Sequence, residues 1–372
     1  MTPDATSLAR GLRRRLTGYG MLGVLLLLCA LFSVLTLQDQ HPTGGRAARD
    51  LAGLVGDDAD RGAPVLLLGR DSDEDREFLD ELEGRLRQAG FEQVRTVAGG
   101  PPEFRAACEA LPAGAGPYLL TLQANLPSVT AIQGSLESLA DATILAPRSY
   151  RWPTFLLADN LRNVANQIAV IAIVAVGMTL VIITAGIDLS VGSLIALSAV
   201  VCAWLVQAMG GQAAGAAALL AAALGAMLVS GLAGLFSGAM VVRFRLPPFI
   251  ATLAMMQVAS GVAYIVAKGR PIYDAPVAFT TLGRGADPLV GLPWAVWLMV
   301  VLYGVAHLLM SRTALGRYVY AVGGNAEAAR LAGVRTGAVL LFVYALSGVL
   351  AGLGGVVMAS QLKSGAPTYG LM

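Results

Sequence analysis

The feature that most constrains this chain is a series of uncharged apolar runs that recur after residue 160. Each is about twenty residues long, and a helix of that length reaches about 30 Å, the thickness of the hydrocarbon core of a bilayer. Only 13% of the 372 residues are charged, whereas about 25% is typical of soluble proteins. The sequence therefore predicts an all-α polytopic membrane protein. A net charge of +2 gives no sign of a nucleic-acid partner.

The chain is expected to cross the membrane about seven times. The first span lies in the run 16–37, which follows four arginines between residues 10 and 15 and is too long for the apolar core of a signal peptide. Six more are expected at 163–186, 190–209, 212–242, 249–266, 289–310 and 337–358. With a cytosolic N-terminus, alternation places 38–160 outside and 311–336 inside. Arginines in the short inside segments agree with the positive-inside rule.

Residues 38–160 differ in composition, being rich in charge and punctuated by glycine and proline. Apolar runs of strand length alternate there with helical patterns, and Ser72 is placed to cap the first helix. The expected strands are 64–69, 94–97 and 118–122, and the expected helices are 72–89, 102–111 and 129–140. This alternation predicts a small inserted α/β domain with a parallel sheet, outside the membrane. We therefore divide the chain into 1–37 (cytosolic N-terminus and first transmembrane helix), 38–160 (external α/β insert and return segment) and 161–372 (transmembrane domain with the cytosolic loop 311–336).

A polar segment interrupts the apolar sequence between the second and third expected spans. It contains Gly186, the carboxylate of Asp188 and the hydroxyl of Ser190. An ionisable group so close to hydrocarbon is costly, which makes it a candidate functional residue. One interpretation is that Asp188 and Ser190 cap the helix that follows. The other, compatible with the first, is that a broken helix lines a polar pathway, since irregular backbone survives at membrane depth only beside protein or water.

The expected cytosolic loop holds a second informative segment. Asn325 is a good N-cap, Glu327 falls in the first turn, and Gly333 can close a short helix. On physical grounds alone, this helix could be a plain surface connector.

No constellation of residues indicates catalysis or metal binding. The three cysteines suggest no disulfide framework, and the two histidines are isolated from any cysteine or histidine cluster. Neither of the two lysines, Lys268 and Lys363, follows a glycine as a nucleotide-binding P-loop requires. We expect no cofactor, no catalytic residue and no metal site, and therefore a protein that is not an enzyme.

Several stretches of the chain together resemble the sugar-importing ABC permeases of the ribose/xylose branch. In order, they are the run 152–163, the run 174–193, Leu246-Pro247-Pro248-Phe249-Ile250-Ala251-Thr252-Leu253, Gly269-Arg270-Pro271-Ile272, and Glu327-Ala328-Ala329 with Gly333. The resemblance covers more than half of the chain.

This resemblance implies the transmembrane subunit of an ABC importer for a monosaccharide-like solute, in a bacterial plasma (inner) membrane. It implies substrate-pathway or gate positions at Thr184, Gly186, Asp188, Ser190 and Thr252. It also implies that the short cytosolic helix docks into an ATPase subunit through Gly324, Asn325, Glu327, Ala328, Ala329 and Gly333. The implied partners are ATP-binding-cassette ATPase subunits that hydrolyse ATP on a separate chain, a second permease copy and an external solute-binding protein.

Two departures from the family pattern qualify this expectation. Family members have only a short link between their first two spans, whereas this chain has the long segment 38–160. They also continue with further helices past the position of Pro367, so the sequence reads as a fragment, one half of a split gene, or a degenerate permease. The alternative function is a membrane-anchored receptor or assembly protein on a degenerate permease scaffold, with 38–160 as its working part.

Overall fold

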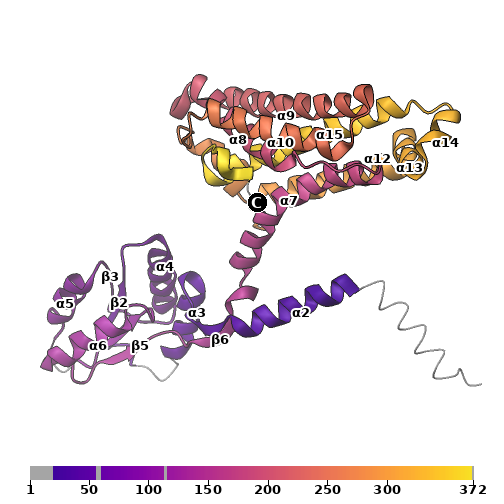
Figure 1. Cartoon of the computed structure of the whole chain (residues 1–372). Helices are drawn as coiled ribbons and strands as arrows, with labels where there is room; N and C mark the ends of the chain where they lie inside the picture. The colour runs from indigo at the N-terminus through magenta and orange to yellow at the C-terminus, as the bar shows by residue number, and fades with distance from the viewer. Residues whose placement is uncertain (1–19, 56–59, 113–114, 371–372) are drawn as a thin grey trace, which may run out of the picture. The chain divides into compact units, whose positions relative to one another are not determined.

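The computed structural model describes residues 20–55, 60–112 and 115–370 (Figure 1). The chain divides into two compact units, Met1–Leu157 and Ala158–Met372. The four arginines between residues 10 and 15, and residues 16–19 of the expected first span, lie outside the described residues.

The first unit is built on a four-stranded parallel sheet with helices on both faces. The strands are β2 (Val65–Gly69), β3 (Val94–Ala98), β4 (Tyr118–Thr121) and β5 (Thr143–Leu145), in the spatial order β3-β2-β4-β5. The helices are α3 (Gly44–Val55), α4 (Asp73–Gln88), α5 (Pro101–Glu109) and α6 (Leu126–Ser135). Val65 and Leu67 of β2, one of the two inner strands, pack with α3 and α4. The alternate residues Leu66 and Leu68 pack with α5 and α6. A strand covered on both faces reads as a continuous apolar run, which is how β2 reads in the sequence.

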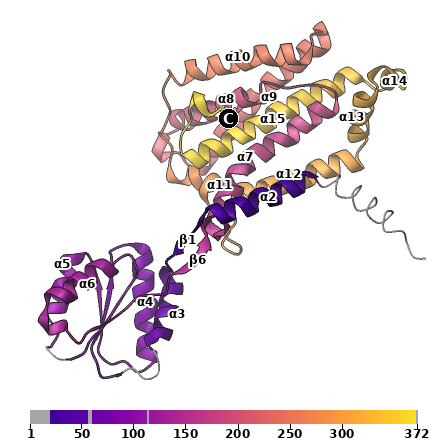
Figure 2. The ribbon, with the colours of Figure 1, turned by 60° about the horizontal axis from the view of Figure 1, so that its bottom comes forward.

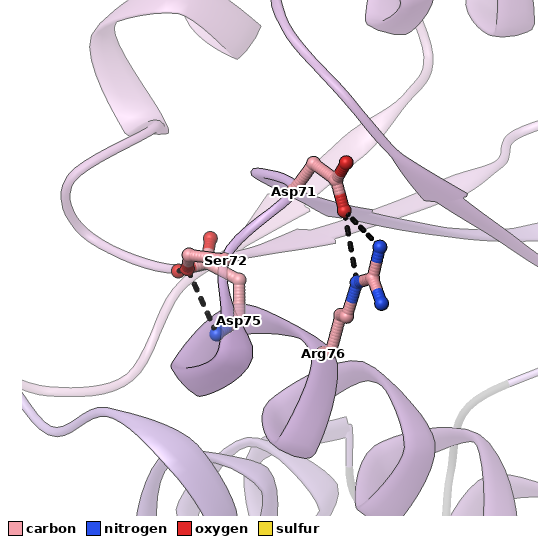
Figure 3. Close-up of polar contacts among 4 residues, drawn as sticks. All are labelled: Asp71, Ser72, Asp75 and Arg76. Atoms are coloured by element: carbon pink, nitrogen blue, oxygen red, sulfur yellow. Dashed lines mark hydrogen bonds and ion pairs between the residues drawn. The ribbon is translucent and has the colours of Figure 1, made fainter. Parts of the chain in front are cut away.

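Strands lie at all three expected places, and the sheet is parallel as expected. Ser72 is the N-cap of α4, and its Oγ accepts the Asp75 N–H at 3.3 Å (Figure 3). The expected helix at 129–140 is shorter, because α6 ends at Ser135 and a 3-10 turn at Glu137–Leu139 follows it. The sequence did not indicate β5 or α3: β5 has only three residues, and α3 begins with two glycines, which are poor helix formers.

A two-stranded ribbon joins the beginning and the end of this sheet unit. Helix α2 (Gly20–Leu35) leads into β1 (Leu37–Gln40), which pairs antiparallel with β6 (Tyr150–Pro153). The Thr154 N–H donates to the Thr36 carbonyl at 2.9 Å, and the rings of Phe32 and Phe155 lie 5.9 Å apart. The chain therefore enters and leaves the sheet unit at one place.

The second unit is a bundle of six helices that are long and apolar enough to cross a membrane. They are α7 (Ala158–Ile183), α8 (Val191–Ala208), α9 (Ala216–Phe244), α10 (Pro248–Val266), α12 (Trp294–Arg312) and α15 (Thr336–Leu362). Within the described residues α2 is also apolar, but with 16 residues it is shorter than these six. The chain is thus a multi-pass membrane protein, and a seventh span through 16–37 stays a prediction.

Helix α15 lies at the centre of the bundle, with α7 and α9 beside it (Figure 2). Its approach to α9 is close at two glycines, since a Cβ added to Gly234 would lie 3.0 Å from the Cα of Gly348. Backbones approach so closely only where side chains are absent, which is the usual mode of tight helix packing in membranes. The small helices α13 (Ala314–Gly324) and α14 (Ala326–Leu331) connect α12 to α15.

Candidate functional site

The polar segment 184–190 begins with a tight turn that ends α7. The Ala185 N–H donates to Ile182 O at 2.9 Å, and the Gly186 N–H donates to Val181 O at 3.0 Å. This pair of bonds is the Schellman motif, in which the residue at the Ala185 position adopts the left-handed conformation and is usually glycine. Ala185 has a φ of 60°, which costs an L-residue with a side chain about 1–2 kcal/mol. The turn is therefore held by its surroundings against a local preference.

Asp188 is fully buried and receives three hydrogen bonds. Its Oδ1 accepts the Ser190 N–H at 3.0 Å and the Ser190 hydroxyl at 2.6 Å. Its Oδ2 accepts the Ser347 hydroxyl of α15 at 3.0 Å. Among the described residues, no basic side chain forms an ion pair with this carboxylate. The buried charge is therefore stabilised by hydrogen bonds, and these bonds fix the segment to α15.

The arrangement differs from the helix cap that the sequence suggested. Ser190 is the N-cap of α8 by position, but its side chain accepts no N–H from the helix and donates to Asp188 instead. Asp188 accepts the N–H of the cap residue itself, one position before the helix. The expectation that Asp188 and Ser190 satisfy the first N–H groups of α8 is wrong, because the hydroxyl finds a stronger, charged acceptor two residues away.

Thr252, in the first half of α10, holds the same segment from another side. Its buried hydroxyl oxygen accepts the Leu189 N–H at 3.1 Å and lies 3.2 Å from the Ile187 carbonyl oxygen. Thr184 is also buried, and its hydroxyl donates to Val181 O at 2.8 Å within the turn. The structure thus brings together Thr184, Gly186, Asp188, Ser190 and Thr252, the five positions implied as pathway or gate residues.

Two further residues of α15 belong to this site and were not identified from the sequence. Ser347 is the Asp188 partner described above. Tyr344 lies one turn earlier and is fully buried, and its hydroxyl is the one buried side-chain polar atom without a hydrogen-bond partner in the described part of the chain. A Cβ added to Gly186 would lie 2.5 Å from that hydroxyl oxygen, so Gly186 leaves room for the tyrosine. The sequence does contain a signal for these two residues. A tyrosine and a serine three residues apart lie on the same face of a helix, and two polar groups on one face of an apolar span indicate a functional site.

A cavity of about 560 Å³ opens beside the segment. Its walls are mostly apolar and come from α7, α8, α10 and the last described residues. They include Met178, Leu189, Ser193, Met256 and Tyr369. Asp188 is itself part of this lining, although it is fully buried among its hydrogen-bonded neighbours.

The second candidate segment forms the short helix that the sequence predicted. The Asn325 side chain accepts the Ala328 N–H at 2.9 Å as N-cap of α14, and Gly333, with a φ of 86°, follows the helix end. Glu327 and Arg330 form an exposed ion pair at 2.5 Å. The hydrogen bond and charge of Arg330 lower the pKa of Glu327, and those of Glu327 raise the pKa of Arg330.

The coupling positions implied by the resemblance divide into exposed and buried ones. Ala329 is buried, whereas the other five are exposed, namely Gly324, Asn325, Glu327, Ala328 and Gly333. The large apolar side chain of Leu331 on the same helix is 80% exposed.

A model of the family described as the permease component of the branched-chain amino acid transport system matches residues 160–372. The ribose import permease protein of Escherichia coli (strain K12) is 41% identical over 224 residues, which is 59% of this chain and 66% of that protein. The L-arabinose ABC transporter permease protein of Azospirillum brasilense is 34% identical over 224 residues, covering 60% of this chain and 63% of its own length. The fructose import permease protein of Rhizobium meliloti is 34% identical over 222 residues, which is 58% of this chain and 60% of that protein.

The chain therefore spans somewhat less than two thirds of the length of these three relatives. No solved structure matches it. The relatives are named as permeases rather than as enzymes, in agreement with the expectation drawn from the sequence.

Proposed function

Since this chain belongs to the family of permease components of branched-chain amino acid transport systems, we propose that it is the transmembrane subunit of an ABC importer that translocates a monosaccharide-like solute. The observation that carries the proposal is the match over 160–372, the same part of the chain that holds the six long apolar helices. The choice of a sugar-like solute follows the names of the relatives, which import ribose, arabinose and fructose.

In this proposal the segment 184–190 is part of the pathway or its gate. Thr184, Gly186, Asp188, Ser190 and Thr252 form one hydrogen-bonded and packed site beside a cavity. Irregular backbone at membrane depth is tolerated where it is buried in protein or lines a water-filled cavity, and this segment lies beside a cavity. Asp188 fixes the shape of the segment through Ser190 and Ser347, and Asp188 and Leu189 both belong to the wall that a solute would meet.

Helix α14 is proposed to dock into the ATPase subunit. Gly324, Asn325, Glu327, Ala328 and Gly333 present an exposed surface, and Ala329 attaches the helix to the bundle. The exposed Leu331 beside the Glu327–Arg330 pair gives this surface an apolar centre with a polar border, which is common in protein interfaces. The proposed complex contains two ATPase subunits, a second permease copy and an external solute-binding protein.

The proposed location is the bacterial inner membrane, with seven spans including α2 and with the N-terminus in the cytosol. This orientation places α14 inside, together with Arg312, Arg317 and Arg335, and it places 38–160 outside. Positive charge concentrated in a short cytosolic loop supports it.

Co-purification of an ATP-binding-cassette ATPase subunit with the chain tests the function. A cognate ATPase subunit should be recovered with the wild type and lost with Glu327→Lys, which places a positive charge next to Arg330 on the docking surface. Glu109→Lys is the matched control, because Glu109 forms a similarly exposed ion pair with Arg105 on α5. Equal recovery with wild type and Glu327→Lys would make α14 a connector. No recovery with either would contradict the permease function.

The α/β unit is the observation that favours a second candidate. A covered parallel sheet of this size is a domain of its own, and a membrane-anchored receptor or assembly protein could use it as the working part on a permease-like scaffold. This candidate requires that no ATPase binds at α14, so the same experiment separates the two.

A further inference from the structure

Helix α13 lies directly against the backbone of the C-terminal end of α7 at Gly323. A Cβ added to Gly323 would overlap the carbonyl oxygen of Ile183 and would lie 2.8 Å from its carbonyl carbon. Any side chain at this position would force the two helices apart. The next residue, Gly324, has nothing within 4 Å of the same hypothetical atom. The contact therefore requires glycine at 323 and makes no such demand at 324.

The two small helices are also packed against α7 and α15 through a compact cluster. We call it the end cluster, and it consists of Leu180, Val181, Val319, Val322, Ala329, Val339, Val343 and Tyr344. These buried residues come from α7, α13, α14 and α15. Because protein interiors are close-packed and barely compressible, a displacement of α13 and α14 is passed to their neighbours.

What lies next to the contact is the polar segment itself. Ile183 is the last residue of α7 and directly precedes the turn at Thr184, Ala185 and Gly186. Tyr344, a member of the end cluster, places its hydroxyl against Gly186. Two routes therefore lead from the small helices to the neighbourhood of Asp188, one through the α7 backbone and one through a buried side chain.

The segment is held in a conformation that is locally unfavourable. Ala185 has a positive φ, and the Tyr344 hydroxyl is buried without a partner. Each of these two features costs free energy and persists only because the surrounding packing imposes it. Such features are typical of elements that can switch between two conformations. A movement of the packing that imposes them is therefore expected to act on the segment.

We propose that Gly323 is a positioning residue that couples the α13–α14 pair to the segment 184–190. By allowing α13 to rest on the Ile183 carbonyl, it makes the turn at the end of α7 follow any movement of α14. Its role in transport rests on the proposed function, in which α14 docks the ATPase. The physical coupling is a property of this chain alone and is tested without any partner.

Hydrogen exchange of the purified 372-residue chain in lipid nanodiscs tests the coupling. Gly323→Ala should speed exchange of the Ala185, Gly186 and Ser190 amides by about tenfold or more, since their hydrogen bonds depend on the position of the turn. Gly324→Ala makes the same chemical change one residue away, and it should leave these amides at wild-type rates. The β2 amides in the other unit should be unaffected in both variants, which distinguishes a local effect from general destabilisation.

The reverse perturbation provides an independent second arm, because coupling between two sites is reciprocal. Ser347→Ala removes the hydrogen bond to Asp188 Oδ2 and should speed exchange of the Asn325 amide, which closes the end of α13 on Ala321 O at 3.1 Å. Ser237→Ala is the control, because the buried Ser237 hydroxyl donates only to Ala233 O in its own helix.

Unchanged exchange at 184–190 in Gly323→Ala, or an equal change in Gly324→Ala, would overturn the proposal. If Gly323→Ala does not fold, the Ser347→Ala arm decides, and a wild-type rate at Asn325 would overturn it. Loss of ATPase co-purification would refute the proposed function and leave these exchange results intact, so the two failures can be told apart.

Discussion

Replacing Asp188 separates its hydrogen bonds from its charge. Asp188→Asn removes the charge but keeps an oxygen that accepts from Ser190, and its amide can donate to the Ser347 oxygen. Asp188→Ala also removes the charge but leaves three buried donors unpaired, namely the Ser190 N–H, the Ser190 hydroxyl and the Ser347 hydroxyl. In Asp188→Asn the Ser347 hydroxyl hydrogen also loses its acceptor, so the two variants differ in the two Ser190 donors and in the packing of the side-chain atoms that alanine lacks.

The expected difference follows from the number of orphaned donors. An unsatisfied buried donor costs roughly 1–3 kcal/mol, so the two Ser190 donors would cost roughly 2–6 kcal/mol. The cavity of about 560 Å³ beside the segment can supply water to these donors, which moves the expected difference in stability to the low end, about 2 kcal/mol. Asp188→Ala should then be less stable than Asp188→Asn by that amount in a reversible detergent titration followed by circular dichroism. Equal stabilities would show that the two hydrogen bonds from Ser190 do not hold the segment, and the role described for Asp188 would be refuted.

Three further outcomes are expected from other parts of the chain. Ala185→Gly should raise the free energy of unfolding by about 0.5–1 kcal/mol in the same titration, because glycine adopts a positive φ without strain. The gain is not larger because glycine also has more conformational freedom in the unfolded chain. Arg330→Gln should raise the pKa of Glu327 towards its ordinary value, which a carbon-13 NMR titration would measure. The ion pair stabilises α14 fully at pH values above the ordinary pKa of a glutamate, and this stabilisation is lost as the pH falls through the lowered pKa of Glu327. Asp80→Cys, on the exposed side of α4 in a background without native cysteines, should react with an impermeant thiol reagent in intact spheroplasts. Labelling only after lysis would refute the external location of 38–160.

Local features of the structure could be predicted from the sequence. The caps at Ser72 and Asn325 follow from a polar residue before a helical pattern, and strands β2 and β4 follow from short apolar runs. Both signals depend only on neighbours in the sequence. The same is true of the break between α9 and α10, which two consecutive prolines impose at Pro247.

The parts that were missed depend on which faces of distant helices meet. Asp188 and Ser347 are separated by 159 positions, and nothing near either residue indicates the other. The direction of the Ser190 hydroxyl likewise depends on where the Asp188 carboxylate is held. The strained backbone at Ala185 could not be predicted, because glycine and not alanine is the usual residue at the left-handed position of such a turn.

The ribbon of β1 and β6 has a consequence for engineering and for evolution. Because Gln40 is paired with Tyr150, the backbones on either side of the α/β unit lie only about 5 Å apart, the spacing of neighbouring strands. Deleting residues 41–149 and closing the gap with Asn-Gly would leave an ordinary hairpin with a two-residue turn. The α/β unit is therefore expected to be removable as a cassette, and an ancestor of this chain could have acquired it in one recombination event without rebuilding the helices on either side.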